Sequence, residues 1–417
     1  MIDLKATLAN SENISKKLKT RGYSLNLKFI EERSELRKQL IQEKEELASE
    51  KNKLSDSFNS VTDDSEKKEL MNNSKSIDEK IQNLKLSLEE VEDSLNSYLL
   101  EVPNIPYDNC PIGNNENDNR LIERFGDINT SNSQEHSDIL AQLDMLSFED
   151  AVKITQSRFV VLKGKIASLH RALVNFMLNI QSGNGYTEYN VPYICNANSL
   201  TGTGQLPKFE EDLFKISDEY YLIPTAEVPL TNLHRGEIID LSSGPFKYTA
   251  HTPCFRSEAG SYGQDTRGLI RQHQFEKVEI VQLVDPSTSF KALEEMTSHA
   301  ENILKLLELP YQVVELCSGD LGFSSAKTYD LEVWLPSQAK YREISSCSNC
   351  LDFQSRRAKI RTKINGETVY IHTLNGSALA AGRALIAVVE NHYDRNHNRI
   401  NIPTSLRDYL KIDYINL

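Results

Sequence analysis

The sequence predicts an α+β protein in which an N-terminal antiparallel helical hairpin precedes a large, mainly antiparallel sheet with flanking helices. Three observations support this prediction. The first hundred residues repeat apolar side chains at helical spacing, and many short runs rich in β-branched and aromatic residues follow residue 148. A segment rich in Pro, Gly and Asn separates the two regions. A change of periodicity within 417 residues indicates two domains rather than one core.

The helical hairpin is predicted from a heptad seam whose apolar positions alternate steps of four and three residues. The members of this seam are Ile77, Ile81, Leu84, Leu88, Val91, Leu95, Tyr98 and Val102. A looser seam precedes it, at Leu36, Leu40, Leu47, Leu54, Phe58 and Val61. The polar segment 60–65 between the seams offers helix-capping residues. We therefore expect two antiparallel helices that reach about 50 Å, at a rise of about 1.5 Å per residue.

The charges of the hairpin do not decide its role. Acidic residues slightly outnumber basic ones, and the lysines nearest the turn are interleaved with acids: Lys51, Lys53, Lys67, Lys68 and Lys75. The net charge of −13 argues against a nucleic-acid binder, because phosphate contacts need local Lys and Arg. Any such surface must therefore be local. Taken alone, the heptads leave both an oligomerisation device and a recognition arm open.

Composition also bears on domain division and compartment. We predict an N-terminal domain over 1–110, a linker over 111–147 and a second domain over 148–417. No apolar run approaches the roughly 20 residues of a membrane span, and the N-terminus lacks the pattern of a secretory signal. Six dispersed cysteines without an export signal indicate reduced thiols. We expect a cytoplasmic protein.

The second domain is dominated by runs with strand character. A helical stretch over 158–180 leads into the β-prone segment 186–194, where Pro192 indicates a strand end or a sheet edge. Further strands are expected over 220–223, 247–255, 269–284, 311–316, 329–334, 341–346 and 369–373. Few helical stretches interrupt them, which indicates an α+β domain built on a large, mainly antiparallel sheet.

The stretch 255–279 carries the most informative chemistry. A strand that ends near Arg256 and Glu258 leads into a Gly-rich loop and then into a second strand. This second strand should present its odd-numbered positions to one face: Arg271, His273, Phe275 and Glu279. Charged groups on a sheet face are costly to bury without partners. Their convergence therefore indicates a site for a charged ligand.

Over essentially its full length, the sequence resembles the bacterial type of seryl-tRNA synthetase, a class II aminoacyl-tRNA synthetase. The stretch around Arg256 resembles class II motif 2, the region through Pro192 resembles motif 1, and 375–383 resembles motif 3. Four further segments match words specific to the seryl family: TGTGQLPKF at 201–209, TAEVPLTN at 225–232, KTYDLEVW at 327–334 and EISSCSN at 343–349. The resemblance implies the class II synthetase antiparallel sheet with a coiled-coil arm.

This resemblance implies a serine–tRNA ligase, an ATP-dependent and AMP-forming enzyme. Such an enzyme makes seryl-adenylate and pyrophosphate from L-serine and ATP. It then transfers the seryl group to the 3′ end of tRNA(Ser), with tRNA(Sec) as a second candidate acceptor. The resemblance further implies Mg²⁺ with ATP, a homodimer formed through the motif 1 region, and tRNA binding by the N-terminal domain.

The resemblance also assigns an ATP site. Arg256 would contact the α-phosphate, Glu258 would lie near the adenine amino group, and Arg271 would reach the outer phosphates. Phe275 and Arg383 would sandwich the adenine ring. Arg256 and Arg383 are the expected catalytic residues. The full set of expected ATP-binding residues is Arg256, Ser257, Glu258, Arg271, Phe275, Glu343, Ile344, Ser345, Ser346 and Arg383.

Metal and serine sites follow from the same resemblance. Glu343 and Ser346 would hold Mg²⁺ through oxygen ligands. The expected serine-binding residues are Thr225, Ala226, Glu227, Arg256, Glu279, Asn375 and Ser377. Thr225 and Glu227 are two positions apart, so on a strand both would face the amino acid.

Some features favour other interpretations. Cys347 and Cys350 have metal-ligand spacing but no second pair nearby, so no zinc site is expected. Gln264 stands where the family usually has arginine, which weakens a charge clamp on the tRNA acceptor end. Ala378 replaces a usual glycine of motif 3, which is tolerable where the backbone is helical. Two rivals remain: a paralogue that serves another acceptor, and a catalytically inactive scaffold. The intact heptads argue against the first, and the complete set of charged site residues argues against the second.

Overall fold

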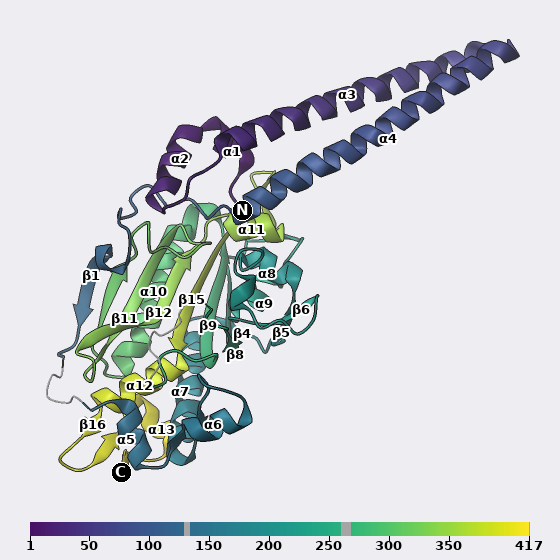
Figure 1. Ribbon diagram of the computed structural model, residues 1–417. Coiled ribbons are helices and arrows are strands. Elements are labelled where there is room, and N and C mark those ends of the chain that lie inside the picture. Colours follow the sequence, from purple (N-terminus) through teal and green to yellow (C-terminus); the bar gives the residue numbers. More distant parts are fainter. Residues whose placement is uncertain (129–133, 260–267, 417) are drawn as a thin grey trace. The chain divides into compact units, whose positions relative to one another are not determined.

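The computed structural model describes residues 1–128, 134–259 and 268–416 (Figure 1). Contacts divide the chain into two compact units. One comprises Asp3–Lys19 and Tyr23–Val102, and the other comprises Met1–Ile2, Thr20–Gly22 and Pro103–Leu417. The three-part division at 110 and 147 stays a prediction. Within the described residues, no helix combines the length and apolar character that a bilayer span requires.

The smaller unit is dominated by a helical hairpin. Its elements are α1 (Leu4–Ala9), α2 (Ser11–Thr20), α3 (Leu27–Ser60) and α4 (Asp64–Glu101). The side chain of Asp63 accepts hydrogen bonds from the amides of Ser65 and Glu66 and caps α4 in the predicted turn. The α4 seam is confirmed at Ile77, Val91 and Leu95, which are buried. The α3 seam is wrong at Leu36, whose side chain is exposed.

The larger unit is built on an eight-stranded sheet. In spatial order its strands are β1 (Arg120–Phe125), β10 (Tyr311–Glu315), β11 (Lys327–Leu335), β12 (Lys340–Asn349), β15 (His372–Ala380), β9 (Gln274–Val284), β8 (Phe246–Phe255) and β4 (Thr187–Glu188) (Figure 1). Each pair of neighbours is antiparallel except β4 and β8, which are parallel. The predicted α+β fold with a mainly antiparallel sheet is therefore confirmed.

Helices and smaller strands surround this sheet. The helices are α5 (His136–Gln142), α6 (Phe148–Ile154), α7 (Gly164–Gly183), α8 (Ala197–Thr203), α9 (Glu227–Asn232), α10 (Ser289–Leu306), α11 (Phe353–Ala358), α12 (Ala381–Asn391) and α13 (Arg407–Leu410). The smaller strands are β2 (Leu146–Ser147), β3 (Val161–Leu162), β5 (Ile194–Asn196), β6 (Tyr220–Leu222), β7 (Ile238–Ile239), β13 (Arg361–Ile364), β14 (Glu367–Tyr370), β16 (Tyr393–Asp394), β17 (Arg399–Asn401) and β18 (Tyr414–Asn416).

The alternation of residues along β9 separates the core from the site. Val278 and Ile280 belong to the main hydrophobic core, to which α7, α10 and α12 also contribute buried side chains. The intervening Lys277 and Glu279 point to the opposite face, as the two-residue period of a strand requires. Helices α7, α10 and α12 thus cover one face of the sheet. The other face carries the charged groups and, further along β9, Val281 and Leu283, which pack with Leu230 of α9.

Several sequence predictions shift against the observed strands. β9 begins at Gln274 rather than at residue 269, so Arg271 precedes the strand. The predicted strand 369–373 divides into the end of β14 and the start of β15, and the rest of β15 was not foreseen. β4 lies at a sheet edge, and Pro192 lies outside the strands, as predicted. The segment predicted as a linker contributes the edge strand β1.

Candidate active site

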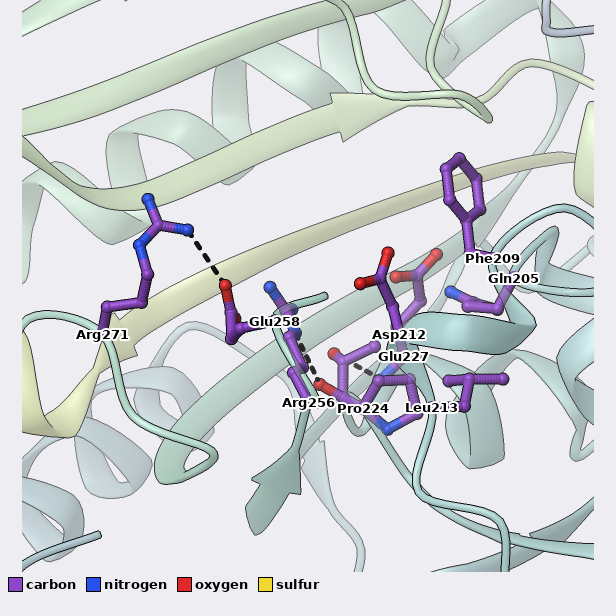
Figure 2. Close-up of a pocket in the computed structure, with 10 residues that line it drawn as sticks. Gln205, Phe209, Asp212, Leu213, Pro224, Glu227, Arg256, Glu258 and Arg271 are labelled. Atoms are coloured by element: carbon purple, nitrogen blue, oxygen red, sulfur yellow. Dashed lines mark hydrogen bonds and ion pairs between the residues drawn. The ribbon is translucent and has the colours of Figure 1, made fainter. Parts of the chain in front are cut away.

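A cavity of about 470 Å³ opens on the face of the sheet that carries the charged groups (Figure 2). It is lined by Gln205, Phe209, Asp212, Leu213, Pro224, Thr225, Glu227, Arg256, Glu258 and Arg271. Motif 2 supplies three of these residues, and the segments over 205–213 and 224–227 supply the others. The cavity therefore joins sequence motifs that lie far apart in the chain.

Motif 2 places two guanidinium groups beside the cavity. Arg256 follows directly after β8, and its backbone amide donates to the carbonyl of His273 at 2.9 Å. Its guanidinium lies 5.2 Å from the ring centroid of Phe275, a cation–π distance. Arg271 donates to Glu258 at 2.9 Å, and Figure 2 shows this pair beside Arg256. The two cations thus lie on one side of the cavity.

A buried carboxylate, Glu279, lies on β9 next to these cations. Its Oε2 accepts a hydrogen bond from Thr225 Oγ1 at 3.2 Å and forms an ion pair with Lys277. Only 2% of the Glu279 side chain and 12% of the Lys277 side chain are exposed. Burial raises the pKa of Glu279, although Lys277 and Thr225 act against this shift. Across the sheet, Ser377 of β15 pairs directly with Glu279.

A second carboxylate, Glu227, lies at the start of α9. Its Oε1 accepts hydrogen bonds from Gln354 Nε2 at 2.6 Å and from Asn375 Nδ2 at 3.1 Å. Burial, followed by the negative charge of Glu279, raises the pKa of Glu227 to about 7. Two acids with polar donors arranged around them can bind a small ligand that carries both an ammonium and a hydroxyl group.

Thr225 and Glu227 do meet, but not on a strand. The predicted strand face is wrong here, because Thr225 precedes α9 and Glu227 is its first residue. The amide of Glu227 donates to Thr225 Oγ1 at 3.3 Å. Ala226 between them is fully buried in a hydrophobic cluster, so its side chain does not line the cavity. A turn into a helix, rather than strand alternation, brings the two side chains together.

Glu343 and Arg383 form a third charged group. Arg383 Nη1 donates to the backbone carbonyl of Glu343 at 2.6 Å and lies 3.3 Å from its Oε2. Desolvation acts to raise the pKa of Glu343, whose side chain is 50% exposed, but Arg383, followed by Arg256 and Lys277, lowers it on balance. Arg256 and Lys277 also act to lower the pKa of Glu279. The charges of Glu343 and Glu279 are therefore coupled through these two cations.

The oxygen atoms around Glu343 fit a divalent cation. Asp330 of β11 pairs with Ser346 of β12. Burial, followed by the charge of Glu343, raises the pKa of Asp330 well above its ordinary value. Its Oδ1 is buried with no hydrogen-bond partner in the described structure. A cation bound to carboxylate and hydroxyl oxygens would relieve both conditions, and Mg²⁺ prefers such ligands. Within the described residues, no group of three or more His, Cys, Asp or Glu forms a metal cluster.

Some predicted site residues use their side chains elsewhere. His273 packs its ring against Phe159 and Phe214 and precedes β9, so the prediction that it shares the face of Glu279 is wrong. Ile344 belongs to the hydrophobic core. Ser345 Oγ donates to the carbonyl of Ser377, and the hydroxyl of Ser257 donates to the carbonyl of Glu211. The hydroxyls of Ser345 and Ser257 can therefore accept, but not donate, a further hydrogen bond without breaking these contacts.

The two departures from the family pattern have different outcomes. Gln264 lies outside the described residues. Ala378 lies within β15. The expectation that its backbone is helical, which would make alanine tolerable in place of glycine, is therefore wrong. Its φ is not among the positive values found for described residues other than glycine, so the backbone there does not favour glycine. The contact of Phe275 and Arg383 with one adenine ring stays a prediction.

Sequence reasoning missed three residues of the site. Lys277 occupies an odd position of β9, between Phe275 and Glu279, so the two-residue period could have revealed it. Asp330 of β11 lies within the segment 327–334, and Gln354 of α11 follows the segment 343–349 by five residues, but neither was given a role in the site. Only the folded chain brings Gln354 to Glu227.

Comparisons with known proteins agree with this geometry. Residues 208–392 match the tRNA synthetase class II core domain (G, H, P, S and T), and residues 1–106 match the seryl-tRNA synthetase N-terminal domain. Serine–tRNA ligase of Psychrobacter sp. is 50% identical over 98% of each chain, and that of Thermodesulfovibrio yellowstonii is 47% identical over 100% of each. A crystal structure of seryl-tRNA synthetase from Pyrococcus horikoshii complexed with ATP superposes with a TM-score of 0.91 at 34% identity, covering 100% of this chain and 99% of that one.

Proposed function

The chain belongs to the seryl-tRNA synthetase family, and from this premise we propose that it activates L-serine with ATP and esterifies tRNA(Ser) with it. One observation carries the proposal. A single cavity brings the guanidinium groups of motif 2 next to the buried carboxylate of Glu279 and the half-buried one of Glu227, with Thr225 and Glu227 among its lining residues. The cations suit a nucleotide triphosphate, and the acids suit an amino acid.

Adenylate formation follows from these charges. The carboxylate of serine is already ionised at neutral pH, so it attacks the α-phosphorus without a general base. Negative charge builds on the phosphoryl oxygens, and pyrophosphate leaves. Arg256 is held by its contacts with Phe275 and Pro224, so it can stabilise that charge without reorganising. Arg271 and Arg383 would bind the outer phosphates and the nucleotide.

The acids of the cavity explain selection of serine. Glu279 and Glu227 offer carboxylate oxygens to the ammonium and hydroxyl groups of the substrate, with Thr225, Asn375 and Ser377 close by. Alanine would leave a buried carboxylate without its hydroxyl partner, which costs about 1–3 kcal/mol. Threonine would be excluded by lack of room.

Glu343 and Ser346 would hold Mg²⁺, with Asp330 beside them. When bound, the ion would neutralise part of the triphosphate charge. Arg383 keeps the carboxylate of Glu343 ionised and in place. Ser377 accepts a hydrogen bond from the amide of Ser346 at 3.3 Å, which connects the serine-binding and metal-binding groups.

The proposal extends to partners. The helical hairpin of α3 and α4 would bind tRNA, including tRNA(Sec), through local surfaces, because the chain carries an excess of acidic residues. We further propose a cytoplasmic homodimer that forms through the motif 1 region, including α7.

Pyrophosphate exchange across all amino acids tests the first half-reaction. Exchange should occur with serine, and it should be weaker with alanine and threonine by at least about tenfold. Charging of a tRNA with a long variable arm tests the second half-reaction. Exchange without charging would indicate the paralogue that serves another acceptor, and no exchange with any amino acid would indicate a scaffold.

A further inference from the structure

A fully buried histidine lies outside the residues discussed so far. His136, the first residue of α5, and Glu390, near the end of α12, have fully buried side chains. His136 Nδ1 lies 2.8 Å from Glu390 Oε1, which also accepts the backbone amide of His136 at 3.1 Å. Glu390 Oε2 accepts the amide of Ser337 at 3.2 Å. The hydrogen bond with His136 helps to keep the pKa of Glu390 below its ordinary value despite burial.

The other ring nitrogen faces the end of the motif 2 loop. The backbone amide of Leu269 donates to His136 Nε2 at 3.1 Å. Because Nε2 accepts this bond, it carries no proton, and the ring proton must lie on Nδ1, where it is donated to Glu390. Glu390 therefore selects the form of the imidazole that can hold Leu269.

Close packing at the preceding residue supports this contact. Gly268 has a φ of +77°, and a Cβ built there would lie 2.5 Å from His136 Nε2. Only glycine combines this backbone angle with such an approach. Two independent features, a buried hydrogen bond and a glycine contact, thus fix the chain to His136 directly before Arg271.

We infer that His136 is a positioning residue for motif 2. Its neutral imidazole fixes Gly268 and Leu269, and Arg271 follows two residues later and pairs with Glu258. Glu390 lies on α12, whose first turn carries Arg383. His136 therefore connects both cationic segments of the nucleotide site, although it touches no substrate. The inference rests on the proposed function, because it assigns Arg271 to ATP.

Two substitutions separate this role from core packing. In His136→Gln, the side-chain oxygen reaches the place of Nε2 and can still accept the amide of Leu269. In His136→Asn, the amide nitrogen replaces Nδ1 and can still donate to Glu390, but Leu269 loses its acceptor. We expect His136→Asn to raise KM for ATP by about tenfold and His136→Gln by less than about threefold. KM for serine should change by less than about twofold in both variants.

Calorimetric binding of ATP without serine provides a second measurement, with the same ranking of the variants. Leu140→Ala on α5 is the matched control, because Leu140 is fully buried in the core. It should lower the melting temperature without changing KM for ATP. The inference is overturned if the Asn and Gln variants bind ATP alike, or if Leu140→Ala weakens ATP binding as His136→Asn does. Absence of serine-dependent exchange in the unmodified protein would instead refute the proposed function.

Discussion

The helical hairpin and the cavity hold their charges in opposite ways. Arg37 of α3 and Glu92 of α4 form an ion pair in which 43% and 38% of the side chains are exposed, whereas Lys277 and Glu279 are 12% and 2% exposed. Exposed pairs contribute roughly 0–1 kcal/mol, and removing one partner of a buried pair costs about 3–5 kcal/mol. A single charged residue of the hairpin can therefore be replaced at little cost in stability. Replacing one charged residue beside the cavity leaves its buried partner unpaired.

We expect the two units to divide the two half-reactions between them. Residues 3–19 and 23–102 contain none of the residues that line the cavity. Serine activation should therefore depend on the larger unit, and tRNA charging should require both.

Replacing Arg256 with alanine removes the cation closest to the proposed site of reaction. We expect pyrophosphate exchange to fall by about 10³-fold, because a fixed cation contributes transition-state stabilisation that mobile water cannot replace. Arg37→Ala is the control, since its ion pair lies on the hairpin, and it should leave exchange unchanged. Equal losses in both variants would contradict the division between the units.

Deleting residues 30–98 removes most of α3 and α4. Exchange with serine should stay within about threefold of the full chain, because the larger unit keeps its own core. Charging of tRNA should fall by about 10²-fold or more, since the phosphate contacts proposed for the arm would be lost. The two reactions are measured on one preparation. Retention of charging would remove the arm from tRNA recognition.

The pKa of Glu227 predicts how serine recognition depends on pH. Because burial, followed by the charge of Glu279, raises its pKa to about 7, the group is mostly protonated at pH 6 and binds an ammonium group poorly. We expect kcat/KM for serine to rise by about fivefold to tenfold from pH 6 to pH 8 and then to level off. Glu227→Gln should flatten this rise and lower the plateau. An unchanged profile in the variant would assign the titration to another group.

The same pKa has a consequence for stability with a defined sign. The folded pKa of Glu227 is raised from 4.5 to about 7, so the folded state binds the proton more tightly than the unfolded state. This contribution to stability is therefore present below about pH 4.5 and is lost as pH rises through 7. Relative to Glu227→Gln, the unmodified protein should lose stability over that window, as urea unfolding at several pH values would show.

The smallest expected effects lie in the hairpin seam. Leu95 is 3% exposed and Leu36 is 37% exposed. Leu95→Ala should lower the unfolding free energy of the hairpin by about 2–3 kcal/mol, and Leu36→Ala by less than about 0.5 kcal/mol. Circular dichroism during urea unfolding measures both, and serine-dependent exchange should be unchanged. Equal losses of unfolding free energy in the two variants would show that Leu36 packs in the seam, as the sequence predicted.

Local sequence determined the elements whose forces are local. The heptads predicted α4, and the polar segment that contains Asp63 predicted the turn before it, because helix periodicity and capping act within a few residues. Most strands of the sheet were also predicted from their composition, as were the edge position of β4 and the convergence of Arg256, Glu258 and Arg271. Each of these features depends on spacing within one segment.

Only the tertiary structure decided which distant groups meet. Gln354 reaches Glu227, Asp330 pairs with Ser346, and His136 holds Leu269. No spacing in the sequence encodes these contacts, because each depends on the register of strands or on helices that the core fixes in place. The turn from Thr225 into α9 and the exposure of Leu36 were misjudged for the same reason. A side chain's partners depend on the packing of the whole fold, whereas its local conformation depends mainly on its neighbours in sequence.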